Sequence, residues 1–136
     1  MARSVREPRT YQLTIELGRP VRVSVGRLGV FDFPAGRYLY TGSARRGLEA
    51  RVRRHLSQTK RLHWHIDYLL AAPGAKIVGV SIFDEPECTI NRRTKRGIVV
   101  KRFGASDCAS GCGSHLKLVK RLPSPPTIPA PSPGVN

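Results

Sequence analysis

Residues 37–44 read Arg-Tyr-Leu-Tyr-Thr-Gly-Ser-Ala, and residues 47–56 read Gly-Leu-Glu-Ala-Arg-Val-Arg-Arg-His-Leu. Tyrosines at every second position, followed by Gly42, are typical of a strand that ends in a turn. The next segment has a helical apolar period, which predicts a buried stripe formed by Leu48, Val52 and Leu56. Arg51 and His55 form a neighbouring i, i+4 pair on the same helix. The unit therefore brings a phenol, a guanidinium and an imidazole close together, a set that suits a phosphodiester better than a structural core.

Working outward, alternation of apolar and polar residues predicts strands over 11–17, 21–25, 38–41, 76–83 and 116–122. The first two are expected to form an antiparallel hairpin, and residues 26–36 are expected to be a loop. Helices are expected over 47–58, 62–71 and 86–95. The fold class predicted is α/β (α+β), a small mixed sandwich with a central, largely antiparallel sheet flanked by helices.

The length of 136 residues fits one folded domain. We expect a basic N-terminal arm over residues 1–9 and the domain over residues 10–122. Residues 123–136 alternate proline with small residues and are expected to be an extended, disordered tail.

The formal net charge is +15, and basic residues are spread along the whole chain. Such a field attracts polyanions, so nucleic acid is the expected partner. An anionic membrane is the rival, but the chain shows no amphipathic basic helix, no long apolar run and no signal-peptide core. We therefore expect a cytoplasmic location and no membrane partner. Composition leaves open a protein that binds nucleic acid without chemistry.

The motif Tyr40-Thr41-Gly42, with Arg51 and His55 at their offsets, resembles the second half of the GIY-YIG nuclease signature. Thr10-Tyr11 resembles the first half, with Arg9 in place of the expected glycine. Four further segments resemble a small stand-alone, Uri-type branch of that superfamily: residues 63–69, 87–88, 103–108 and 114–116. The resemblance covers roughly residues 10–120, and the order and spacing of the motifs make it specific.

The resemblance implies a central three-stranded antiparallel sheet and hydrolysis of a phosphodiester with one metal ion. It also implies a catalytic set made of Tyr11, Tyr40, Arg51, His55 and Glu87. Glu87 would hold Mg²⁺ or Mn²⁺, and Glu85 is the fallback ligand. Tyr38 is interpreted as a core aromatic.

The chemistry can also be argued from the residue types. A free tyrosine has a pKa of about 10 and is a poor base at neutral pH. Nearby cations, Arg51 foremost, are expected to lower that pKa and make a phenol a plausible general base. Arg51 can also bind phosphate oxygens as charge builds up in the transition state.

Two further sets of residues are predicted to bind ligands. Contacts to nucleic acid are expected from Arg45, Arg46, Arg53, Arg54, Lys60, Arg61 and His65. Three cysteines in an intracellular chain argue against a disulfide framework. A structural zinc site is possible from Cys88, Cys108, Cys112 and His115, although its spacing is not a standard one and buried free cysteines are common.

The leading hypothesis is a metal-dependent endonuclease acting on DNA, including branched or damaged DNA, with low sequence specificity and a possible partner protein for targeting. The alternative is a nucleic-acid-binding module that has lost catalysis, since a bulky Arg9 would displace Tyr11. A third hypothesis is a zinc-stabilised, RNA-associated protein.

Overall fold

The computed structural model describes residues 9–44, 46–57, 62, 64–94, 97–104 and 114–121. Within them lies a four-stranded antiparallel sheet in the order β5-β1-β4-β6, and a second sheet formed by β2 and β3. The strands are β1 Thr10–Leu17, β2 Val21–Val25, β3 Gly29–Phe33, β4 Gly36–Ser43, β5 Ala75–Phe83 and β6 Leu116–Arg121. The helices are η1 Gly26–Leu28, α1 Leu48–Leu56, α2 His65–Leu70 and α3 Glu87–Arg92.

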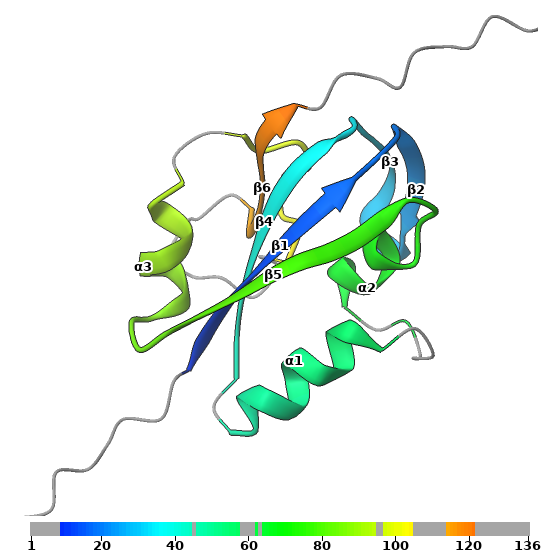
Figure 1. Ribbon diagram of the computed structural model, residues 1–136. Helices are drawn as coiled ribbons and strands as arrows, with labels where there is room; N and C mark the ends of the chain where they lie inside the picture. Colours follow the sequence, from blue (N-terminus) through cyan, green and yellow to red (C-terminus); the bar gives the residue numbers. More distant parts are fainter. Residues whose placement is uncertain are drawn as a thin grey trace, which may run out of the picture.

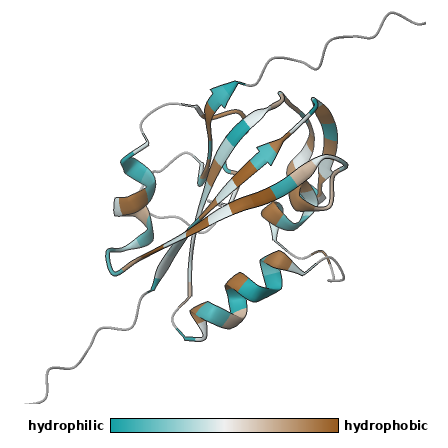
Figure 2. Cartoon of the chain, viewed as in Figure 1, coloured by the Kyte–Doolittle hydropathy of each residue, from teal (hydrophilic) through white to brown (hydrophobic). Residues whose placement is uncertain are grey.

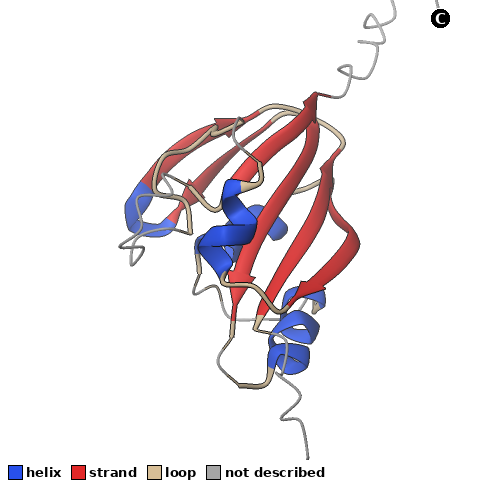
Figure 3. Cartoon of the chain, turned by 90° about the vertical axis from the view of Figure 1, so that its left-hand side faces the viewer, coloured by secondary structure: helices blue, strands red, loops and turns tan. Residues whose placement is uncertain are grey.

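The main sheet lies between helices (Figure 1). Helices α1 and α2 lie on one side of it and α3 on the other, which the turned view also shows (Figure 3). This arrangement confirms the predicted mixed α/β class with a largely antiparallel sheet. The main sheet has four strands rather than three, because β5 and β6 add to the two sides of β1 and β4.

The expected hairpin between the first two strands is wrong. β2 pairs with β3, while β1 pairs with β4 and β5. β1 is thus a central strand with a neighbour on each side, and its apolar residues are fully buried. The segment 26–36, expected to be a loop, contains η1 and β3, so β2 finds its partner there.

The core lies on the side of the sheet that faces α1 and α2. Leu13 and Ile15 on β1 pair directly with Tyr40 and Tyr38 on β4, so all four side chains share this face. Hydrophobic and hydrophilic residues alternate along the strands (Figure 2). Phe33 closes the core from β3, with its ring 6.4 Å from Tyr38 and 6.0 Å from Phe103, both in edge-to-face geometry.

Helix α1 presents a different face to the sheet from the one expected. Leu56, predicted to be buried, is 52 % exposed, whereas His55 is 2 % exposed. Leu48 and Val52 are half-buried. The helix is rotated because His55 bonds to a residue of the central strand, as described below.

In the described part of the chain, no helix combines the length and the apolar character that crossing a membrane requires.

Phe33→Ala should lower the free energy of unfolding by about 3–5 kcal/mol, because it removes a fully buried ring that touches both sheets. Val30→Ala on the same strand is the matched control, since Val30 is 60 % exposed and its truncation should cost under about 0.5 kcal/mol. Urea unfolding of the two variants measures the difference; equal costs would contradict the position assigned to β3.

Candidate functional site

The site begins where β1 and β4 pair at one end of the sheet. Tyr11 lies directly opposite Gly42. A Cβ added to Gly42 would lie 2.4 Å from the Tyr11 hydroxyl oxygen, closer than atoms can approach. Gly42 is therefore required for the phenol of Tyr11 to lie across β4.

A buried hydrogen bond joins this phenol to helix α1. The Tyr11 hydroxyl lies 2.6 Å from His55 Nε2, and each residue is 2 % exposed. The Tyr40 ring lies 6.1 Å from the same imidazole in edge-to-face geometry. Three residues predicted to be catalytic thus form one cluster, with His55 between the two signature tyrosines.

Arg51 and Glu87 meet at Ser43, the last residue of β4. Arg51 Nη1 donates to the Ser43 carbonyl oxygen at 2.7 Å, and the Ser43 hydroxyl donates to Glu87 Oε2 at 3.2 Å. Arg51 comes from α1 and Glu87 is the first residue of α3, so the two come from opposite sides of the sheet. The two side chains therefore converge at the end of β4, as the hypothesis of a shared site requires.

Glu87 has a second neighbour in His115, whose Nδ1 lies 3.2 Å from Glu87 Oε1. His115 is 2 % exposed, and its carbonyl oxygen accepts a hydrogen bond from the Thr41 amide at 2.9 Å. The side chain of Glu87 is 27 % exposed, so a ligand can reach its carboxylate. Glu85, the fallback ligand, is more exposed and pairs with Arg93.

The predicted zinc ligands are not all described. Cys88 is partly buried on α3, and His115 faces Glu87, while Cys108 and Cys112 lie outside the described residues. Over the described ranges, no group of three or more His, Cys, Asp or Glu side chains is arranged to hold a metal ion. The zinc site stays a prediction.

Trp64 holds the arginines of α1 in place. The guanidinium carbon of Arg51 lies 4.7 Å from the centre of its ring, and that of Arg54 lies 4.2 Å away. Arg54 also makes two 2.9 Å hydrogen bonds to Asp67, which is fully buried at the start of α2. Arg54, predicted to contact nucleic acid, thus anchors α1 to α2.

His65 also has an anchoring contact where a contact to nucleic acid was predicted. Its Nδ1 accepts a hydrogen bond from the Gly104 amide at 2.9 Å, and burial lowers its pKa. A Cβ on Gly104 would lie 3.0 Å from the Tyr40 ring. A neutral His65 therefore holds the segment around Gly104 against Tyr40.

The other predicted contacts to nucleic acid are partly described. Arg46 is exposed, and Arg53 is exposed and paired with Glu49. Arg45, Lys60 and Arg61 lie outside the described residues. Arg9 is exposed, and its carbonyl oxygen accepts a hydrogen bond from the Ala44 amide at 2.9 Å. The expectation that Arg9 displaces Tyr11 is therefore wrong: the backbone of Arg9 pairs normally and Tyr11 is seated.

The expectation that cations lower the tyrosine pKa is also wrong. Burial raises the pKa of Tyr11, and Arg51 offsets only part of this rise. Burial raises the pKa of Tyr40 well above its usual value, and the neighbouring Tyr11 and Glu87 add to the effect. Both residues are therefore protonated phenols at neutral pH. Tyr38 is a core aromatic as interpreted, with its hydroxyl bonded to the Pro34 carbonyl at 2.6 Å.

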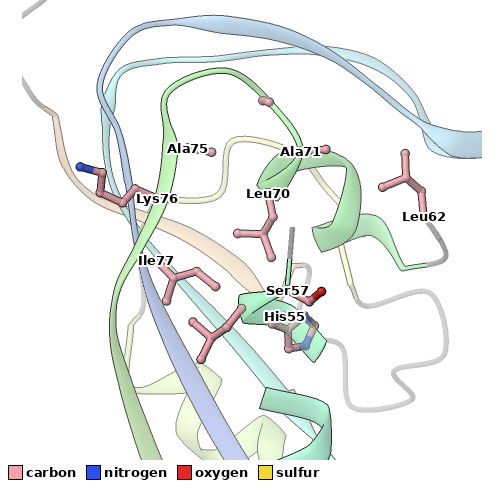
Figure 4. Close-up of a pocket in the computed structure, with 10 residues that line it drawn as sticks. His55, Ser57, Leu62, Leu70, Ala71, Ala75, Lys76 and Ile77 are labelled. Carbon is pink, nitrogen blue, oxygen red and sulfur yellow. The ribbon is translucent and has the colours of Figure 1, made fainter. Parts of the chain in front are cut away.

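A cavity of about 540 Å³ lies on the other side of His55, between α1, α2 and β5 (Figure 4). Its described lining is mainly apolar, with Leu56, Leu70 and Ile77 among its walls. Of the predicted catalytic residues, only His55 lines it. The cavity lacks the carboxylate and the guanidinium of the predicted catalytic set, which lie around Ser43 instead.

Sequence reasoning missed the roles of three contributors to the site: Ser43, Asp67, and His115, which was named only as a possible zinc ligand. Ser43 directly follows the signature glycine, which is a usable signal. His115 and Asp67 carry no local pattern that assigns them, since their roles come from contacts with residues far away in the chain.

Comparison with known proteins gives one family match. The family described as "Domain of unknown function DUF123" matches residues 10–128. No curated protein and no solved structure matches the chain.

Gly42→Ala should break the Tyr11–His55 hydrogen bond, because the new methyl group would occupy the position of the phenol. We expect a loss of about 1–3 kcal/mol in the free energy of unfolding, as for an overpacked core. Gly18→Ala is the control, since nothing lies within 4 Å of its added Cβ. A Gly42→Ala protein as stable as the Gly18→Ala protein would contradict the geometry of this cluster.

The buried tyrosines give stability a defined dependence on pH. Burial raises the pKa of Tyr11, Tyr38 and Tyr40 in the folded chain, so the unfolded chain releases their protons first, at about pH 10. These groups stabilise the fold fully below that pH, and the free energy of unfolding should fall as pH rises above it. Urea unfolding at stepped alkaline pH, followed by tyrosinate absorbance, measures this. Full ionisation of all tyrosines near pH 10 in a still folded chain would contradict the assignment.

Proposed function

The chain belongs to the DUF123 family, and we propose that it is a metal-dependent endonuclease that hydrolyses phosphodiester bonds in DNA. The observation that carries the proposal is the convergence of Tyr11, Arg51, His55 and Glu87 at Ser43 and Gly42. These residues come from three separate elements, β1, α1 and α3. A carboxylate, a guanidinium and a phenol–imidazole pair are together the groups that phosphodiester hydrolysis needs.

Glu87 would hold one Mg²⁺ or Mn²⁺. Its carboxylate is partly exposed and lies beside the Ser43 hydroxyl, which is the kind of hard oxygen environment that Mg²⁺ takes with one or two carboxylates and several waters. When bound, such an ion neutralises charge on the phosphate and on the leaving oxygen. His115, on the other carboxylate oxygen, would fix the orientation of Glu87.

Arg51 would bind the phosphate. One of its nitrogens is bonded to the Ser43 carbonyl, and its guanidinium stacks on Trp64, so the group is held rigidly. Its other donors can bond non-bridging phosphate oxygens as negative charge develops.

The phenol–imidazole pair would activate water. Because Tyr11 is protonated at neutral pH, it would donate its proton to His55 Nε2 while its oxygen accepts one from the attacking water. The resulting hydroxide forms the new bond to phosphorus as the bond to the leaving oxygen breaks. The 2.6 Å separation between the Tyr11 hydroxyl and His55 Nε2 is short enough for this relay.

The net charge of +15 supports a nucleic acid as the substrate, and we propose that this is DNA in the cytoplasm. Within the described residues we recognise no helix-turn-helix or other module for reading bases, which supports low intrinsic sequence specificity, with branched or damaged DNA read through its shape. A partner protein would then supply targeting.

A second candidate is a basic nucleic-acid-binding module without catalysis. The observation in its favour is the burial of the reacting groups, since Tyr11 and His55 are each only 2 % exposed. The two functions differ in one measurable property, the turnover of DNA in the presence of a divalent ion.

Arg51→Ala should lower the rate of plasmid nicking in Mg²⁺ or Mn²⁺ by about 10²–10³-fold, because it removes a donor to the transition state. Glu87→Ala should abolish nicking through loss of the metal carboxylate. Both variants should keep most of the binding to DNA, because many other basic residues remain.

Arg53→Ala and Glu85→Ala are matched controls, because both residues are exposed or partly exposed neighbours outside the cluster. They should nick at the wild-type rate. Wild-type nicking by Arg51→Ala or Glu87→Ala would remove that residue from the mechanism. Retardation of DNA without nicking, with every metal ion tested, would favour the binding module.

A further inference from the structure

Asp67 is the one acidic side chain among the described residues that is fully buried. An ionised carboxylate is costly to bury unless it is paired and hydrogen-bonded. Asp67 accepts hydrogen bonds from Nη1 and Nη2 of Arg54 at 2.9 Å each, and from the backbone amide of Trp64 at 2.8 Å. Trp64 is the residue that caps the start of α2. One carboxylate therefore fixes both the guanidinium of Arg54 and the backbone that carries the Trp64 ring.

The Trp64 ring carries two guanidinium groups of α1. The guanidinium carbons of Arg51 and Arg54 lie 4.7 and 4.2 Å from its centre. Each cation is attracted to the ring, but two like charges held this close to one ring also repel each other. The repulsion is offset because Arg54 is paired with Asp67. Arg51 is bonded to the neutral carbonyl of Ser43 instead, and no ion pair within the described ranges engages it.

We propose that Asp67 is a positioning residue for Arg51. By neutralising Arg54, the carboxylate allows both guanidinium groups to lie over one ring, and it thereby holds Arg51 at the end of β4. This role rests on the proposed function, in which Arg51 binds the phosphate. Without the carboxylate, repulsion from Arg54 should displace Arg51, whose other described contact is a hydrogen bond to a carbonyl oxygen. Arg51 would then meet the phosphate in the wrong geometry, although the site as a whole would be more positive.

A second arginine–carboxylate pair on α1 provides the matched comparison. Arg53 pairs with Glu49, and the two side chains are 73 % and 84 % exposed. Water screens such a surface pair, so it contributes little to the structure. By contrast, the Arg54 and Asp67 side chains are 29 % and 0 % exposed, so their charges act in a poorly solvated environment. Removing the carboxylate of Asp67 should therefore displace Arg51, whereas removing that of Glu49 should not.

The NMR signal of the Arg51 Nε–Hε group reports the position of the guanidinium without reference to activity. The ring current of Trp64, the one tryptophan of the chain, shifts the resonance of protons held over its face. The Arg51 signal is identified as the one that Arg51→Lys lacks. In Asp67→Asn it should move toward its position in Trp64→Leu, which has no ring there, whereas Glu49→Gln should leave it in place. An Arg51 signal that is unchanged in Asp67→Asn would overturn the proposal.

A neutral pair tests whether charge is the cause. Arg54→Gln combined with Asp67→Asn removes both charges. The two amide side chains can then bond to each other, while the asparagine oxygen still accepts the Trp64 amide hydrogen. With no repelling guanidinium beside it, Arg51 should give its wild-type signal. A displaced Arg51 signal in this double variant would overturn the proposal, and this result decides the question even where Asp67→Asn alone does not fold.

Kinetics separate positioning from binding. In single-turnover nicking with Mg²⁺, Asp67→Asn should be about 10²-fold slower, because a small displacement of a group that binds the transition state is costly. Its affinity for DNA should not fall, because the substitution removes a negative charge. The double variant should regain most of the rate, and Glu49→Gln should nick at the wild-type rate. Lost affinity with an unchanged rate would overturn the role of Asp67. A wild-type chain that cuts no DNA would instead count against the proposed function alone, since the Arg51 signal still shows whether Asp67 positions Arg51.

Discussion

The hydrogen bond between the Tyr11 hydroxyl and His55 is the constraint on which the site depends. It joins the central strand to α1, and it exists only because Gly42 leaves space for the phenol. Once His55 is turned toward the sheet, the helical period brings Arg51 to the end of β4 and turns Leu56 outward. One polar contact inside the core therefore sets the rotation of the helix and the position of the guanidinium.

Burial raises the pKa of Tyr11 and Tyr40, whereas nearby positive charge lowers it, and the effect of burial is the larger one. The chain carries 24 lysines and arginines, and among the described residues Arg51 and Arg54 lower the pKa of Tyr11. Arg54 is already bonded to Asp67, and Asp67 and Glu87 act in the opposite direction. A large net charge spread over a surface does little inside the core, where a phenol loses its hydration. This is why composition alone misjudged the protonation of these residues.

The sequence predicted the features that depend on neighbours in the chain. Period-two and helical patterns located β1, β4, β5 and α1 to within a few residues. Strand pairing was harder, because an alternating pattern does not say which strand lies beside it. β2 therefore received the wrong partner, and β3, which lies within the segment 26–36 expected to be a loop, was missed.

The site residues divide in the same way, into those marked by a local pattern and those that depend on contacts between distant segments. The tyrosines, Arg51 and His55 were marked by spacing within one motif, and Glu87 by a resemblance. The contacts of Ser43 and His115 with that carboxylate depend on how the ends of β4 and α3 meet, and no local pattern records this.

Sheet order connects the site with the free edge. The two tyrosines lie on the inner strands β1 and β4, where neighbours on both sides bury them and fix their geometry. β1 is an inner strand because β5 pairs with it, and β5 in turn forms the edge of the sheet. Leu13 on β1 pairs with Val80 on β5. Leu13 is fully buried, whereas Val80, on the edge strand, is 38 % exposed.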